Sequence, residues 1–159
     1  MKKTVALLLC ILLCLGGCAY TKDGDEEYVT KGEALPSLGT AEKDSVAYVT
    51  AKLIAAGQMV RDYYETKGTV EGMEASCTVR TNGVSCEIYK MDESSALYAQ
   101  ICKTGSYPLM DDEGNVLVSR RAAVNGAFVL MIPSEQNVKG EDVTALNDKL
   151  IRRFEELKL

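Results

Sequence analysis

Apolar side chains recur at every third or fourth position between about residues 41 and 66. This spacing places them along one face of a helix, because an α-helix has 3.6 residues per turn. The stripe consists of Val46, Val49, Leu53, Ala56 or Gly57, Val60 and Tyr64. Thr40 or Asp44 is the expected N-cap, and Gly68 lies just past the expected end. The pattern therefore predicts one long helix over residues 41–66.

Two pairs of short apolar runs follow, each around an Asn-Gly dipeptide. The segment "ASCTVRTNGVSCEIY" is centred on Asn82-Gly83, and "VLVSRRAAVNGAFVLMI" contains Asn125-Gly126. Asn-Gly favours a type I′ turn, because both central residues of that turn need a positive φ. The sequence therefore predicts two β-hairpins.

A helical pattern follows each hairpin. In "MDESSALYAQICKTG", Asp92 is the expected N-cap and Gly105 the expected end. The apolar face of this helix consists of Ala96, Leu97, Ile101 and Cys102. A last helix is predicted over residues 141–157. Its apolar stripe consists of Val143, Leu146, Leu150, Phe154 and Leu157.

Strand, Asn-Gly turn, strand and helix thus occur twice in the same order. Two explanations stay open: an internal duplication of a ββα unit, or two hairpins that independently use a favoured turn. In either case we expect an α+β fold, with an N-terminal helix followed by two ββα units. The expected sheet is antiparallel, has four or five strands and carries its helices on one face. Residues 41–159 then form a single domain.

The N-terminus has a different pattern. Lys2 and Lys3 precede the uninterrupted apolar run "VALLLCILLCL", residues 5–15. This run is shorter than the ~20 apolar residues that a helix needs to cross a bilayer, and its flanks are typical of a secretory signal peptide. It ends in "LGGC", residues 15–18, which resembles the lipobox of bacterial lipoproteins.

The resemblance covers residues 1–19 and has consequences for the mature chain. In lipoproteins a diacylglycerol is attached to the cysteine sulfur, and the peptide is cut just before that cysteine. The resemblance implies that residues 1–17 are removed and that Cys18 is lipidated on the extracytoplasmic face of the cell membrane. A secreted protein cut nearby and a retained transmembrane helix are the alternatives. Residues 18–40 lack apolar periodicity, which predicts a flexible tether.

The cysteines that remain after the lipidation site are Cys77, Cys86 and Cys102. Cys77 and Cys86 form a candidate disulfide. A two-residue loop at Asn82-Gly83 makes them diagonal neighbours with Cα atoms ~7–8 Å apart, beyond the usual disulfide span of about 4.4–6.8 Å. A four-residue loop places them directly opposite each other, and a pair of buried free thiols is the other alternative. Cys102 is expected in the core.

Composition narrows the chemistry that is open to this chain. Its 159 residues include 23 acidic and 18 basic side chains, and the net charge of −5 argues against nucleic acid as a partner. The absence of histidine excludes Ser-His-Asp and Cys-His catalysis and His-ligated metal sites. The acidic segments "DGDEE" and "DDEGN" do not match a calcium-binding loop. We therefore expect no catalytic residue, no metal and no cofactor.

Tyrosine is the one residue type that suggests a binding surface. The candidates are Tyr63, Tyr64, Tyr98 and Tyr107, which exceed what the apolar stripes need. Tyrosine is enriched at binding surfaces because it supplies contact area at little entropic cost. The alternative is that these side chains cover the edge of the core.

The segments "EIYKMDESSALYAQI" and "VNGAFVLMI" make the folded region similar to small surface lipoproteins of Gram-positive bacteria. In those families a lipobox precedes a compact α+β domain, and the likeness implies no catalytic residues. We expect a membrane-anchored, non-enzymatic binding or interaction module, whose partner is an envelope protein or a small ligand. The alternatives are an accessory solute-binding lipoprotein of a transporter and a small hydrolase that uses carboxylates alone.

Overall fold

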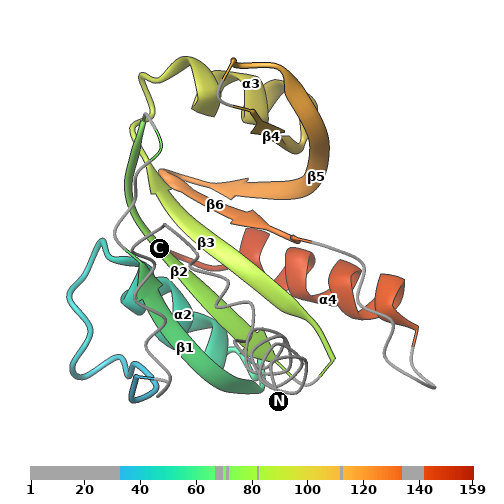
Figure 1. The fold of residues 1–159 in the computed structure, drawn as a ribbon. Coiled ribbons are helices and arrows are strands. Elements are labelled where there is room, and N and C mark those ends of the chain that lie inside the picture. Colours follow the sequence, from blue (N-terminus) through green and yellow to red (C-terminus); the bar gives the residue numbers. More distant parts are fainter. Residues whose placement is uncertain (1–32, 67–69, 71, 82, 112, 134–141) are drawn as a thin grey trace, which may run out of the picture.

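The described residues form one six-stranded antiparallel sheet and three helices (Figure 1). The computed structural model describes residues 33–66, 70, 72–81, 83–111, 113–133 and 142–159. The helices are α2 (Val46–Ala55), α3 (Ala96–Thr104) and α4 (Val143–Glu155). The strands are β1 (Val60–Thr66), β2 (Met73–Thr81), β3 (Ser85–Met91), β4 (Ser106–Met110), β5 (Val116–Asn125) and β6 (Phe128–Met131). The predicted signal peptide, Cys18 and most of the predicted tether lie outside the described residues.

Across the sheet the strands follow the order β1-β2-β3-β6-β5-β4. Three consecutive strands form each half, and β3 pairs with β6 to join the halves. The predicted α+β class and antiparallel pairing are confirmed. The predicted count of four or five strands is wrong, because β1 precedes the first predicted hairpin and β4 precedes the second. The order that repeats is therefore one helix followed by three strands.

β1 replaces the second half of the helix predicted over residues 41–66. α2 ends at Ala55, and Gly57 follows with a φ of +84°, a left-handed conformation that leads the chain out of the helix. Val60 and Tyr64 have helical spacing, but the fully buried residue between them is Tyr63. The segment is a strand with one buried face, so its period is two residues.

Side-chain oxygens cap all three described helices at their N-termini. The caps are Ser45, Ser95 and Asp142, each accepting a hydrogen bond from a backbone N–H of the first turn. They differ from the predicted caps Thr40, Asp44 and Asp92. Gly105 ends α3 with a φ of +64°, as predicted.

The helices cover both faces of the sheet, which corrects the predicted one-sided arrangement. α2 and α4 pack on one face, and α3 packs on the other (Figure 1). β6 lies between these two layers and is buried at every position. Phe128 and Leu130 contribute to the core under α2 and α4, whereas Val129 and Met131 contribute to the core under α3. A continuous apolar run is typical of a strand that is covered on both faces.

Both predicted hairpins are present, β2–β3 and β5–β6, but their registers differ. The Thr81 N–H donates to the Val84 carbonyl at 2.9 Å, which closes a two-residue loop between β2 and β3. In the second hairpin Asn125 pairs with Phe128, so the loop residues are Gly126 and Ala127. Asn125 is therefore the last residue of β5, and its side-chain amide donates to the Phe154 and Leu157 carbonyls.

Candidate functional site

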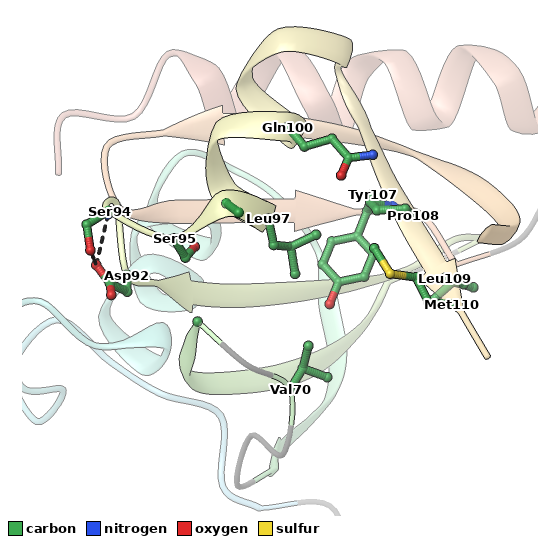
Figure 2. A pocket seen from close by; sticks show the side chains of 12 residues that line it. Val70, Asp92, Ser94, Ser95, Leu97, Gln100, Tyr107, Pro108, Leu109 and Met110 are labelled. Atoms are coloured by element: carbon green, nitrogen blue, oxygen red, sulfur yellow. Dashed lines mark hydrogen bonds between the residues drawn. The ribbon is translucent and has the colours of Figure 1, made fainter. Parts of the chain in front are cut away.

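An open crevice of about 720 Å³ lies between α3, β4 and the end of the β1–β2 connection (Figure 2). We call it the α3–β4 crevice. Its apolar lining consists of Val70, Ala96, Leu97, Pro108, Leu109 and Met110. Its other lining residues are Gly72, Asp92, Ser94, Ser95, Gln100 and Tyr107.

The N-terminus of α3 is held against the β1–β2 connection, and this forms one wall of the crevice. The Asp92 N–H donates to the Gly72 carbonyl at 2.8 Å. The Ser95 Oγ accepts the Tyr98 N–H at 3.2 Å and starts the helix at that point. A Cβ added to Gly72 would lie 2.7 Å from the Ser95 Cβ, so only glycine fits here between the connection and the helix.

β4 forms the opposite wall. Gly105 ends α3 and accepts a hydrogen bond from the Ala122 N–H at 2.9 Å, which brings the chain directly onto β5. Tyr107 and Leu109 then join the apolar cluster under α3 while they line the crevice. The crevice is thus formed where the sheet edge and the start of α3 diverge.

Tyr107 supplies a hydroxyl to the crevice. Only 4% of the residue is exposed, and its ring stacks on Tyr89 with centroids 5.0 Å apart and an interplanar angle of 18°. Its hydroxyl points into the crevice (Figure 2). The hydroxyl of a tyrosine is neutral at ordinary pH and offers a hydrogen-bond donor, and burial raises the pKa of Tyr107 further.

The remaining polar lining gives the crevice a negative edge. Asp92 is the one charged side chain among the described lining residues. Its Oδ1 accepts the Ser94 N–H at 2.8 Å and the Ser94 hydroxyl at 2.7 Å, and these hydrogen bonds lower the pKa of Asp92. Gln100 extends from α3 with an amide that can both donate and accept (Figure 2).

Apolar surface continues beyond the crevice. Val70 and Met110 line it and are nevertheless 45% and 46% exposed. Met110 pairs with Val116 on β5, and the neighbouring crevice residue Leu109 pairs with Val118. Val116 and Val118 are themselves exposed. We call Val70, Met110, Val116 and Val118 the apolar rim.

The four tyrosines predicted as a binding surface do not share one. Tyr63 is buried in the core under α2 and α4. Tyr64 follows it on the strand and points to the other face, where the Arg80 guanidinium lies 5.6 Å from the ring centre. Tyr98 lies on α3 and donates to a loop carbonyl. Tyr107 is the member of the set that lines the α3–β4 crevice.

The cysteines lie away from the crevice. Cys77 and Cys86 are buried free thiols, and Cys77 Sγ is 3.7 Å from the Thr50 hydroxyl. Cys86 pairs with Val79, so the two thiols have the diagonal relation that a two-residue loop predicts. Cys102 is exposed on α3, which corrects its expected place in the core.

A second hollow of about 540 Å³ lies near the C-terminus. Its charged lining consists of Lys43, Asp44 and Lys158, and Tyr48 and Phe128 contribute aromatic rings. Its lining carries both signs of charge, whereas the charge of the α3–β4 crevice has one sign. Among the residues that the structure describes, no group of three or more acidic or cysteine side chains is placed to hold a metal ion.

Comparisons with known proteins assign no family and no function. No protein-family model, no curated protein and no solved structure matches the chain. Within the described residues, no helix is both long and apolar enough to cross a membrane.

Sequence reasoning did not single out the crevice, because its lining comes from three separate segments that only the folded structure brings together. Leu97 is expected on the apolar face of its helix, where it reads as core. The sequence feature that indicates one wall of the crevice is Pro108, since a proline inside an apolar run is typical of an edge strand. That reading assigns "SYPLM" to β4 and places its side chains at the border of the sheet.

Proposed function

We propose that this chain is a lipid-anchored, extracytoplasmic, non-enzymatic binding module whose binding site is the α3–β4 crevice. The anchor rests on the lipobox-like "LGGC" at residues 15–18. Two acyl chains on Cys18 hold a protein durably at a bilayer, because each buried CH₂ contributes ~0.8 kcal/mol.

One observation carries the binding site: an apolar crevice of about 720 Å³ into which the hydroxyl of the largely buried Tyr107 points (Figure 2). Ligand sites typically measure about 300–1,000 Å³ and combine apolar walls with a few placed polar groups. The walls supply burial, and the hydroxyl and the Gln100 amide orient the bound group. A group that enters the crevice gains affinity from the apolar area that it removes from water.

Two alternatives fit the same residues less well. A carboxylate-dependent hydrolase needs two acidic groups across the reacting bond, and Asp92 is the single carboxylate of the described lining. An accessory solute receptor is favoured by the crevice volume alone. Such a receptor encloses its solute, whereas Val70 and Met110 stay about half exposed at the rim of this crevice.

Thermal unfolding of the full-length chain in neutral phosphatidylcholine nanodiscs tests the site. We expect at least one member of a panel of amino acids, amines, aromatic alcohols and short peptides to raise the Tm by a few degrees. A ligand at 100 times its Kd stabilises the folded state by about 2.7 kcal/mol. Tyr107→Phe should reduce that rise and Tyr48→Phe should not, since Tyr48 lies in the second hollow. A rise that both variants keep in full, or no rise with any compound, contradicts the proposed site.

The anchor has a separate test. Cys18→Ser should move the chain from the membrane fraction to the soluble fraction and abolish labelling with a clickable fatty acid. Serine lacks the sulfur that carries the diacylglycerol, so membrane retention of this variant contradicts the anchor. The two tests have separate readouts, membrane retention for the anchor and Tm for the crevice.

A further inference from the structure

We infer that the α3–β4 crevice takes one apolar side chain of an extended partner polypeptide, and that basic residues of the partner flank this anchor. The inference rests on the proposed function, because it names the ligand class of the same site. Three observations support it: the apolar surface extends beyond the crevice, acidic residues lie at its ends, and the edge of β4 is blocked to an added strand.

The apolar surface is longer than a small solute needs. Met110 belongs both to the crevice lining and to the exposed surface, and cross-strand pairing continues that surface to Val116. Val70 extends it on the side of the β1–β2 connection. A ligand confined to the crevice leaves Val116 and Val118 of this rim in water. A polypeptide that places one side chain in the crevice covers the rim with its neighbouring residues.

Acidic residues beside the apolar surface favour a polypeptide with basic residues. Asp92 and Glu93 lie at the start of α3, and Asp111 and Glu113 lie in the turn that follows β4. Hydrogen bonds from Asn115 lower the pKa of Asp111, so this carboxylate is ionised across the physiological pH range. Asp92 lines the crevice and Asp111 directly follows Met110, so a carboxylate stands at each of these two ends of the apolar surface. Lysine or arginine on both sides of the anchor is complementary to them.

The edge of β4 argues for a side-chain anchor rather than an added strand. Gly105 accepts the Ala122 N–H, so by the alternation of an antiparallel pair the backbone groups of Ser106 and Pro108 point away from β5. The Thr104 hydroxyl occupies both outward groups of Ser106. Pro108 has no N–H at all. A partner strand therefore finds this edge blocked, which is a known protection of sheet edges.

The partner backbone can pair with the polar groups of the crevice. Every peptide unit offers a carbonyl acceptor, and the Tyr107 hydroxyl points into the crevice as a neutral donor. Gln100 lies on the α3 side, where its amide can pair with a second backbone group (Figure 2). An extended segment thus has partners for its polar backbone as well as for its apolar anchor.

The test uses fluorescein-labelled synthetic peptides and the full-length chain in neutral phosphatidylcholine nanodiscs, with empty nanodiscs as the blank. One peptide carries a central Leu between lysines, a second has Ser in place of Leu, and a third has glutamates in place of lysines. Fluorescence anisotropy should show that the first binds at least about tenfold more tightly than either of the others. Equal binding of the lysine and glutamate peptides, or of the Leu and Ser peptides, overturns the inference.

Matched variants locate the binding. Met110→Ser should weaken binding of the lysine-flanked Leu peptide several-fold. Leu38→Ser is the control and should leave this binding unchanged, although Leu38 is as exposed as Met110, 47% against 46%. Glu93→Lys with Glu113→Lys should abolish the preference for lysine flanks. Glu42→Lys with Glu155→Lys makes the same change in net charge elsewhere and should preserve it. Loss of the preference in both pairs overturns the inference, because the effect then follows net charge alone.

Other occupants give different results. Sedimentation of the nanodisc-held chain should show one copy per disc at all concentrations, and self-association lost in Met110→Ser identifies a second copy as the occupant instead. A small solute that raises the Tm through Tyr107 while no peptide binds overturns the polypeptide inference and leaves the proposed site intact. Failure of both solutes and peptides removes the proposed function as well.

Discussion

Gly72 and Ser95 are packed so closely that a Cβ on Gly72 would lie 2.7 Å from the Ser95 Cβ. Gly72 also has a φ of +80°, which L side chains rarely adopt. Two requirements for glycine thus coincide where the β1–β2 connection meets the cap of α3. This contact fixes the wall of the α3–β4 crevice that sequence patterns do not reveal.

Gly72→Ala should therefore destabilise the fold by about 2–4 kcal/mol. Two costs add up: an alanine held at a positive φ, and the clash of its Cβ with the Ser95 side chain. Gly114→Ala is the matched control, since Gly114 has a φ of +83° and no atom within 4 Å of the added Cβ. That variant should lose only about 1 kcal/mol. Urea unfolding of both variants measures the difference. Equal losses mean that the Ser95 contact contributes nothing.

Asn125 connects the second hairpin to the end of α4. Its amide donates to the Phe154 carbonyl at 2.7 Å, in the last turn of α4, and to the Leu157 carbonyl at 3.0 Å, just past the end of the helix. Asn125→Ala should cost about 1–3 kcal/mol of unfolding free energy. Asn115→Ala, which removes an amide from an exposed turn, should cost less than about 1 kcal/mol. The proposal of a C-terminal cap fails if urea unfolding gives the two variants the same loss.

The sequence predicts the parts of the fold that depend on local chemistry. Asn82-Gly83 marks the first hairpin, Gly105 marks the end of α3, and the apolar stripe of residues 143–157 marks α4. Each of these signals acts within a few residues, through positive φ or through helical period. They suffice for the α+β class.

The rest depends on tertiary neighbours. Val60 and Tyr64 fit a helical stripe, and only the buried place of Tyr63 in the sheet shows that they belong to a strand. Helices pack on both faces of the sheet. The hydrophobic period of a segment shows that it forms a helix, but it does not show on which face of the sheet that helix packs. The crevice is harder still, because Val70, Leu97 and Leu109 meet only after α3 crosses the sheet.

Buried tyrosines should make the fold sensitive to alkali. Burial, and secondly hydrogen bonds to Glu65 and Glu87, raise the pKa values of Tyr63 and Tyr89 above the ordinary value near 10. The unfolded chain then releases these protons first as pH rises. The stability is fully present below about pH 10 and is lost progressively above it.

Phenolate absorbance recorded together with circular dichroism checks this order. Part of the phenolate signal should appear only with the loss of ellipticity. The variant Tyr89→Phe should shift the alkaline unfolding midpoint upward, since it removes one group whose ionisation favours the unfolded state. Complete phenolate formation in a chain that keeps its ellipticity contradicts the burial of these hydroxyls.

The buried thiols give the last prediction. Burial raises the pKa of Cys77 to about 12 and that of Cys86 still further, while Cys102 is exposed on α3. Thiolate is the reactive form. In the proposed mature chain, which lacks residues 1–17 and has its Cys18 sulfur lipidated, iodoacetamide should label Cys102 quickly in the native state and the other two only on unfolding. Labelling in denaturant without reductant, read by mass spectrometry, separates the alternatives for the pair. Two further labels confirm free thiols, whereas no further label and a mass lower by two hydrogens identify a Cys77–Cys86 disulfide.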